Sequence, residues 1–341
     1  MYKLIIKSAF SSLFQRKSRT ALVILMIATS LYGLMLIQGV YEGMVSQMIN
    51  NAIKSDSGEV SLFAKNYRSE KDIKLQIKNI QEIEQVLEQN LDIKSYSKKI
   101  LSQGLIATAK YNKNVKIYGI DLEKEKNHSS FNRYIIDGKY SFGNRDNGVI
   151  IGYTLARKLK ISLGKKVILS AQNINNEVSS IALKVTAIIK TNNMAFDESG
   201  VFIDFKRAKN FLGVENPNQI SILFYDFKES SFLNLQNSLK AYKSDIDIFS
   251  WDELYPALLQ SRDLMSTFNY ISYTLVFFTA TIGIFGVVLV SVLERLKEFG
   301  ILQAIGTGFY LIVAMIFFES FFIGLVGFIL GSIIGGLHLW Y

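Results

Sequence analysis

Apolar residues gather in three long stretches, and each stretch predicts a membrane-spanning helix. Residues 21–40 carry no charge, residues 264–293 carry none over 30 positions, and residues 299–341 contain a single acid, Glu319. A helix needs about 20 apolar residues to cross a hydrocarbon core. The pattern therefore predicts spans at 21–40, with an extension to about residue 53, at 264–293 and at 309–339.

The first 20 residues indicate where the N-terminus lies. They contain five cations and no acid directly before the first apolar run. Basic residues flank spans on the cytoplasmic side, so the N-terminus is predicted to be cytoplasmic. The 20-residue run is longer than the core of a secretory signal, which favours an uncleaved span. Apolar positions at helical spacing over 1–20 predict an amphipathic helix lying flat at the membrane surface; the alternative is the cytoplasmic end of the first span.

With this orientation, the chain between the first two spans lies outside the cytoplasm. It covers residues 41–267, with a core domain predicted over 54–260. Residues 294–308 then form a cytoplasmic loop, and the third span runs outward again. The predicted fold class is an α-helical membrane protein of three spans, with a large mixed α+β domain inserted between spans 1 and 2.

Alternating and helical patterns both occur in the inserted domain. A helix is expected from Ser69-Glu-Lys-Asp72 to Asn90, with apolar positions at helical spacing. Turn-forming residues at 111–114 and 172–177 predict two hairpin tips. Strands are expected at 100–110, 115–120, 148–151, 165–171, 181–190, 201–204, 220–225 and 245–250, and short helices at 153–160, 205–212 and 230–241.

Composition and charge exclude several function classes. The chain is 49% hydrophobic and only 20% charged, which is unusual for a soluble protein, and it has no cysteine and two distant histidines. These counts make a disulfide scaffold, a metal site or a catalytic triad improbable. The net charge is +9, but residues 41–267 account for only +5 and show no basic stripe, so nucleic acid is not expected as a partner.

The connector between the second and third spans holds the strongest candidate for a docking site. Its charged residues can face water or a partner, while Leu293, Leu296, Ile301 and Leu302 face the bilayer side; the other interpretation is a charged cap between two spans. The candidate residues are Glu294, Arg295, Lys297, Glu298, Gly300, Ala304 and Gly306. The sequence contains no G-x-x-x-x-G-K-[ST] phosphate loop, so ATP and Mg²⁺ would bind to another polypeptide.

Two features lie within the third span. Glu319 is an acid in an apolar run, where an unpaired charge costs about 2.5 to 3.5 kcal/mol, so it should face protein or water. A structural, hydrogen-bonded acid is favoured over a proton relay. Gly324, Gly327, Gly331 and Gly335 lie at helical spacing, which favours close helix packing over glycine content alone.

The segment Glu294-Arg-x-x-Glu-Phe-Gly-Ile-Leu-x-Ala-Ile-Gly306 resembles the membrane domain shared by the FtsX, MacB and lipoprotein-releasing (LolC/LolE) permeases of ABC transporters. The leader resembles the elbow helix of that family, and the excursion resembles its periplasmic core domain, with landmarks at 118–125, 136–138, 149–156 and 163–169. Family members have four spans, whereas three are found here. The hairpin at 172–177 is short for a carrier-binding hook, which counts against docking of a periplasmic lipoprotein carrier.

The resemblance implies a non-catalytic permease subunit of the bacterial inner membrane, working by mechanotransmission with a cytoplasmic ABC ATPase and a second permease. The connector would be the coupling helix. The lipoprotein-releasing branch is favoured, with membrane lipid and acylated cargo near Met44, Met48, Phe268 and Ile271. A MacB-like exporter of a peptide, toxin or drug is the alternative. An FtsX-like regulator of a cell-wall hydrolase would have a smaller domain, and a membrane-anchored enzyme lacks a recognisable nucleophile and base. The cargo and the choice between homodimer and heterodimer stay open.

Overall fold

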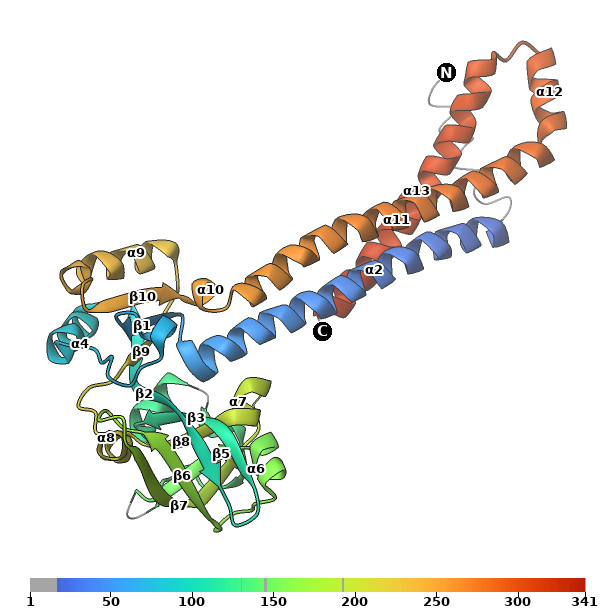
Figure 1. The fold of residues 1–341 in the computed structure, drawn as a ribbon. Helices are drawn as coiled ribbons and strands as arrows, with labels where there is room; N and C mark the ends of the chain where they lie inside the picture. The colour runs from blue at the N-terminus through green and yellow to red at the C-terminus, as the bar shows by residue number, and fades with distance from the viewer. Residues whose placement is uncertain (1–16, 130, 144–145, 192, 341) are drawn as a thin grey trace. The chain divides into compact units, whose positions relative to one another are not determined.

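The computed structural model describes residues 17–129, 131–143, 146–191 and 193–340 (Figure 1). The chain divides into two compact units, one formed by residues 1–46 with 260–341 and the other by residues 47–259. The predicted elbow helix over 1–20 falls almost entirely outside the described residues. Only its last four positions are described, and they belong to the first long helix.

Three helices of the structure are long and apolar enough to cross a membrane. They are α2 (Lys17–Ala52), α11 (Pro256–Glu294) and α13 (Phe309–Trp340), with 36, 39 and 32 residues. At about 1.5 Å per residue, α2 and α11 are about 54 and 58 Å long, against about 30 Å of hydrocarbon. The first two helices therefore extend well beyond a bilayer core. A short helix, α12 (Leu296–Ala304), connects α11 to α13.

The second unit is built on one ten-stranded mixed sheet, in the order β10-β1-β9-β2-β3-β8-β5-β7-β4, with β6 pairing to β2 and β7. The β3–β8 and β5–β7 pairs are parallel, and the other pairs are antiparallel. The strands are β1 (Val60–Ala64), β2 (Ile93–Ala107), β3 (Asn112–Ile120), β4 (Ile135–Gly138), β5 (Gly148–Gly152), β6 (Lys166–Gln172), β7 (Val178–Ile189), β8 (Gly200–Asp204), β9 (Gln219–Phe224) and β10 (Ile246–Ser250).

Helices cover the sheet and separate its buried core into clusters. Around β1, β9 and β10 the core is closed by α4 (Ile80–Gln89) and α9 (Glu229–Ser238). Around β5, β6 and β7 it is closed by α6 (Tyr153–Leu159) and α8 (Phe205–Leu212). A third, aromatic cluster includes Phe196 of α7 (Met194–Ser199). The remaining helices are α3 (Tyr67–Glu70), α5 (Leu122–His128), α10 (Trp251–Leu254) and short turns at Ile53–Ser57, Phe131–Tyr134 and Lys240–Tyr242.

The 15-residue strand β2 joins the part of the sheet that contains β9 to the part that contains β3 and β6. Its N-terminal half pairs with β9, from Ile93 to Lys99. Its C-terminal half pairs with β3 and β6, out to Ala107. One continuous strand therefore forms hydrogen bonds in both parts of the sheet.

The first span is followed by a π-helical turn, Ile53–Ser57, that ends at Gly58. Gly58 has φ +66°, and a Cβ atom there would overlap the carbonyl oxygen of Ile222 on β9. Only glycine fits both the left-handed conformation and this close approach. The turn that follows α2 is thus fastened to the sheet at Gly58.

The predicted fold class is confirmed: three candidate spans, with a mixed α+β domain between the first and the second. The predicted helix from Ser69 to Asn90 is wrong in its first half. Lys71 and Asn79 adopt left-handed conformations, and only residues from Ile80 onward form the expected helix. Tertiary hydrogen bonds replace helical ones between them, because the Ile77 amide donates to the Pro217 carbonyl and the Gln76 side chain accepts from two backbone amides.

Most other predicted elements occur within a few residues of their expected bounds. The hairpin tip at 172–177 is present, closed by the Asn173 amide donating to the Glu177 carbonyl. The other turn comes earlier than predicted: Thr108 donates to Tyr111, and β3 already begins at Asn112. The strands β1 and β4 were not predicted. The five residues of β1 are all buried and therefore show no alternation of apolar and polar positions.

Candidate functional site

The predicted connector folds into the helix α12, which ends in a glycine-dependent cap. The Gly306 amide donates to the Gln303 carbonyl, and the Thr307 amide donates to the Leu302 carbonyl. This is the Schellman pattern, which requires a left-handed residue at the position of Gly306. Its φ of +96° meets that requirement. Gly306 therefore sets where α12 stops and the chain turns into α13.

Arg295 lies at the N-terminus of α12 and joins it to the third span. Its Nη1 donates to Glu319 Oε2 on α13 at 3.2 Å, and its Nε donates to Glu298 Oε2 at 3.0 Å. The guanidinium also lies over the ring of Phe299, 5.3 Å from its centroid. The side chains of Arg295 and Glu319 are only 16% and 18% exposed. Glu319 is therefore paired with a cation within the membrane unit.

The position of Arg295 corrects one expectation from the sequence. We predicted that it would face water or a partner, but it points inward because Glu319 needs a counter-charge in an apolar helix. Leu296 and Ile301, predicted to face the bilayer side, are 56% and 62% exposed, as lipid-facing residues would be, and Phe299 is the buried residue of α12. The other predicted docking residues are exposed: Glu294, Lys297, Glu298, Gly300, Ala304 and Gly306.

Three of the four predicted packing glycines of α13 contact α2. A Cβ atom on Gly327 would lie 2.9 Å from Ile27 Cβ, and one on Gly331 would lie 2.9 Å from the Ala28 carbonyl oxygen. Gly335 meets Met35 in the same way. Gly324 differs, since a Cβ there would only touch Ile284 at 4.0 Å. The sequence did not single out Gly39 and Gly283, where a Cβ would overlap Leu339 and Met26.

The four residues predicted to lie near acylated cargo are exposed. Met44 and Met48 lie one turn apart on α2, with 56% and 50% of their surface accessible. Phe268 and Ile271 lie one turn apart on α11, at 65% and 52%. They offer two apolar patches on the parts of these helices nearest the inserted domain in sequence.

A buried polar network in the domain was not predicted. Lys99 Nζ lies 3.4 Å from Glu125 Oε1, and the Ser97 hydroxyl donates to Glu125 Oε2 at 2.5 Å. Burial alone would raise the pKa of Glu125, but the attraction of Lys99 and this hydrogen bond bring the pKa below its usual value. These contacts fasten α5 to β2. The sequence feature that could have indicated this network is the pair Glu125 and His128, an acid and a base one turn apart on a short helix.

His128 extends this network to β9. Its Nδ1 and Nε2 lie 3.1 Å from Ser95 Oγ and 2.8 Å from Ser221 Oγ. Burial lowers the pKa of His128 to about 4, while the attraction of Glu125 opposes the shift. Ser221 has no exposed surface, and its contact with His128 joins α5 to β9 inside the domain. Among the described residues, no group of three or more His, Asp or Glu could hold a metal ion.

Comparison with known proteins identifies both parts of the chain. Residues 20–230 match the family model of the MacB-like periplasmic core domain, and residues 270–341 match that of the FtsX-like permease C-terminal region. Relatives include the lipoprotein-releasing system transmembrane protein LolE of Haemophilus influenzae, 22% identical over 75% of this chain, and the ABC transporter permease YknZ of Bacillus subtilis, 25% identical over 60%. The chain covers 62% and 51% of their respective lengths.

Solved structures with similarity to the chain include the periplasmic region of MacB from Actinobacillus actinomycetemcomitans. It is 14% identical with a TM-score of 0.42, and the match covers 61% of this chain and 94% of the other. The extracellular domain of YknZ gives 14% identity and a TM-score of 0.39, covering 56% and 99%. The family model of the core domain alone spans more than half of the residues. The chain belongs to the family of ABC transporter permeases that combine a MacB-like periplasmic core domain with an FtsX-like C-terminal region.

Proposed function

We propose that this chain is the permease subunit of an ATP-driven transporter that works by mechanotransmission. A separate cytoplasmic ATPase binds ATP and Mg²⁺, and its closure moves α12. The observation that carries the proposal is the Arg295–Glu319 pair, which ties the connector to the third span at 3.2 Å. A movement of α12 is then transmitted to α13, because the ion pair joins the two helices.

The contacts of α13 support passing this movement to the first span. The backbone of α13 approaches α2 at Gly327 and Gly331, where side chains would not fit. Close backbone contact leaves little room for one helix to slide without moving the other. From there α2 is one continuous helix to Ala52, and Gly58 fastens the following turn to β9. The connector thus contacts α13, and α13 contacts α2, so a movement of α12 would reach the first span through these contacts.

The exposed surface of α12 suits docking of another protein. Gly300 lies inside the helix, where glycine costs about 1 kcal/mol relative to alanine. A Cβ at Gly300 would meet no atom within 4 Å in the described part of the chain, so no internal contact there explains the glycine. Close approach of a partner backbone would explain it. Lys297 and Glu298, exposed beside it, supply charges for recognition.

A second permease is part of this proposal. No residue of the 39-residue helix α11 is buried. Its apolar surface includes Phe277, Phe278 and Phe285, each more than half exposed. Lipid can cover part of this surface, and the matching helix of a second copy or of a related subunit would cover the rest.

For the cargo, we propose an acylated protein drawn from the outer leaflet. The similarity to LolE supports this choice, as do the lengths of α2 and α11, which exceed a bilayer core. Met44, Met48, Phe268 and Ile271 offer exposed apolar surface for acyl chains, each buried CH₂ contributing about 0.8 kcal/mol. Methionine adapts its shape to different chains.

The ATPase arm of the proposal is tested on α12. Gly300→Leu, and separately the exchange Lys297→Glu with Glu298→Lys, should lower co-purification of the ATPase or uncouple its hydrolysis, while the permease stays in the membrane. The matched control exchanges Lys158 and Glu198, an exposed pair in the inserted domain with Nζ and Oε1 3.3 Å apart. Normal coupling in both α12 variants would contradict docking at this helix.

The cargo arm is tested with photo-crosslinkers at Met44, Met48, Phe268 and Ile271, and at Leu91, an exposed leucine of the domain, as a control. Capture of acylated lipoproteins at the four positions, and not at Leu91, supports extraction from the leaflet. Capture of only unacylated peptides or small molecules would favour a MacB-like exporter.

A further inference from the structure

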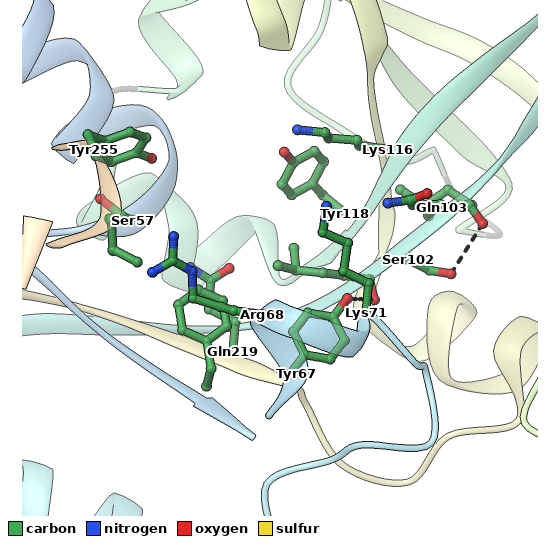
Figure 2. A pocket seen from close by; sticks show the side chains of 14 residues that line it. Ser57, Tyr67, Arg68, Lys71, Ser102, Gln103, Lys116, Tyr118, Gln219 and Tyr255 are labelled. Carbon is green, nitrogen blue, oxygen red and sulfur yellow. Dashed lines mark hydrogen bonds between the residues drawn. The ribbon is translucent and has the colours of Figure 1, made fainter. Parts of the chain in front are cut away.

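A cavity of about 340 Å³ lies inside the second unit, lined by β1, α3, β2, β3, β9 and the residues before α11. Its fourteen lining residues include Arg68, Lys71 and Lys116 and no acid. Figure 2 shows the ammonium groups of Lys71 and Lys116 on the side of Tyr118, and the guanidinium of Arg68 on the side of Ser57. The volume is that of a small-ligand site.

The positive charges of Arg68, Lys71 and Lys116 at the cavity are not neutralised by carboxylates among the lining residues. Within the described ranges, none of the three cations forms an ion pair with a carboxylate; Arg68 instead lies over the ring of Phe249, 4.8 Å from its centroid. All three residues are exposed, so they can meet a charged ligand at the mouth without a large desolvation cost. The arrangement favours an anion carrying more than one charge.

Gln219 supplies an unpaired acceptor on the wall. It is 2% exposed, and its Oε1 has no hydrogen-bond partner among the residues that the structure describes. The orientation of its amide is fixed, because Ser61 donates its only proton to the Ser57 carbonyl at 2.6 Å and must accept from Gln219 Nε2 at 3.1 Å. A buried acceptor without a donor destabilises the folded state, because its hydrogen bond to water is lost and not replaced. A hydroxyl or N–H group of a ligand would remove that destabilisation.

Lys71 is held in an unfavourable backbone conformation at the cavity. It caps α3 with φ +53° and ψ +26°, in the left-handed region that glycine adopts freely and lysine does not. A glycine would give this cap at lower cost. The presence of lysine is explained if its side chain is needed at this position.

We propose that this cavity binds a phosphate ester of a small polyol, such as a glycerol phosphate unit. A phosphate offers three terminal oxygens and up to two charges to Lys71, Lys116 and Arg68, whereas a carboxylate offers two oxygens and one charge. A polyol hydroxyl donates to Gln219 Oε1. The rings of Tyr67 and Tyr118 and the side chain of Leu101 cover the carbon skeleton. The ester is either free in solution or the headgroup of a phospholipid.

The site is independent of the cargo proposed above. Its ligand would contact Ser57, which ends the turn after α2, and Tyr255, which directly precedes α11. Both chain entries into the domain therefore line one cavity. Occupancy would stabilise the domain at these two entries.

Binding is measured by calorimetry on the full chain in phosphatidylcholine nanodiscs, with glycerol phosphate, glycerol and succinate as probes. Glycerol phosphate should bind, and the other two should bind at least about tenfold more weakly. Lys116→Gln should lower the affinity about tenfold or more, corresponding to the loss of one charge-assisted hydrogen bond. The control is Lys113→Gln, an exposed lysine three positions earlier on β3 and hence on the opposite face of the strand, which should change affinity less than twofold.

The variant Lys71→Gly distinguishes an effect on ligand affinity from an effect on the stability of the fold. It should lower the affinity about tenfold while the thermal stability of the chain is maintained or rises, since the backbone strain is relieved. Lys160→Gly is the matched control: Lys160 has φ +51° at the end of α6, outside the cavity, and its replacement should leave the affinity unchanged. Gln219→Met should weaken glycerol phosphate more than inorganic phosphate, because only the ester carries the hydroxyl.

Native mass spectrometry of the chain released from phosphatidylglycerol nanodiscs distinguishes the two sources of the ester. A retained lipid that is lost in Lys116→Gln assigns the site to a headgroup. Binding of free glycerol phosphate without a retained lipid assigns it to a soluble ester. Equal binding of succinate, equal effects of Lys113→Gln and Lys116→Gln, or the absence of both lipid and ester would overturn the proposal.

Discussion

Arg295 binds Glu319 across 24 positions of sequence, and this pair makes the connector a part of the third span. Removal of one partner leaves the other charge without its counter-ion in an apolar setting, which typically costs several kcal/mol when the pair is buried and less when it is partly exposed. The pair is 16% and 18% exposed, so an intermediate cost is expected.

Arg295→Gln should therefore lower the stability of the membrane unit by about 2 kcal/mol. Glu319→Gln should cost less, because the amide oxygen still accepts from Arg295 and no charge is left in the apolar helix. Thermal unfolding in nanodiscs measures both variants. Glu298→Gln is the control, since Glu298 is 65% exposed and should contribute less than about 1 kcal/mol. Equal effects of Glu298→Gln and Arg295→Gln would mean that the pair with Glu319 adds nothing.

The glycines of α13 should differ in their tolerance of a methyl group. Gly331→Ala places a Cβ 2.9 Å from the Ala28 carbonyl oxygen, so the helices must separate, with an expected loss of about 1 to 3 kcal/mol. Gly324→Ala meets its nearest atom only at 4.0 Å and should be neutral or slightly stabilising. Cysteine crosslinking between α2 and α13, in a chain that has no native cysteine, reports whether the contact survives. A tolerated alanine at Gly331 would argue against close packing of these helices.

Acidification should destabilise the inserted domain through His128. Its pKa is about 4 when folded and about 6.5 when unfolded, so between these values the unfolded chain binds more protons. Stability therefore falls as the pH drops from 6.5 towards 4, by at most about 3 kcal/mol. Unfolding followed by Trp251 fluorescence, in a Trp340→Phe background that leaves one tryptophan, measures the slope.

His128→Asn should flatten this slope between pH 5 and 6.5, although the variant will be less stable overall because two serine contacts are altered. Glu125 has a lowered pKa, and it adds to the loss only as the pH falls below about 4.5. An unchanged slope in His128→Asn would assign the pH dependence to other groups.

Orientation in the membrane is predicted by the charge of the first 20 residues. A single cysteine at Lys113, on the inserted domain, should react with an impermeant thiol reagent in intact spheroplasts. A cysteine at Gln303, on α12, should react only after permeabilisation. The reverse labelling pattern would invert the topology and place the connector away from any cytoplasmic ATPase.

The spans and most strands were predictable from the sequence because their signals are local. Charge-free runs define helices in lipid, and the residues of β5 and β8 form short apolar segments between turns. The pairing of Arg295 with Glu319 was not predicted, although each residue was noted separately, because the geometry of the connector decides which way the arginine points.

The cavity residues could not be predicted for a related reason. Arg68, Lys116 and Gln219 are distant in sequence, and the order of strands in the sheet brings them together. The misplaced helix start near Ser69 has the same origin. The apolar spacing there was real, since Ile73 and Ile77 are buried, but the carbonyl of Pro217 competes for the backbone amide of Ile77.

The shared strand β2 also limits where this domain can change during evolution. Inserting or deleting one residue between Ile93 and Ala107 would turn every later side chain of the strand to the opposite face. Ile100 and Ile106, both fully buried, would then lose their places in the core, and the pairing with three other strands would shift at once. The hairpin tip at 172–177 carries no such constraint. Relatives with different cargo should therefore vary in length at this tip and keep the length of β2 constant.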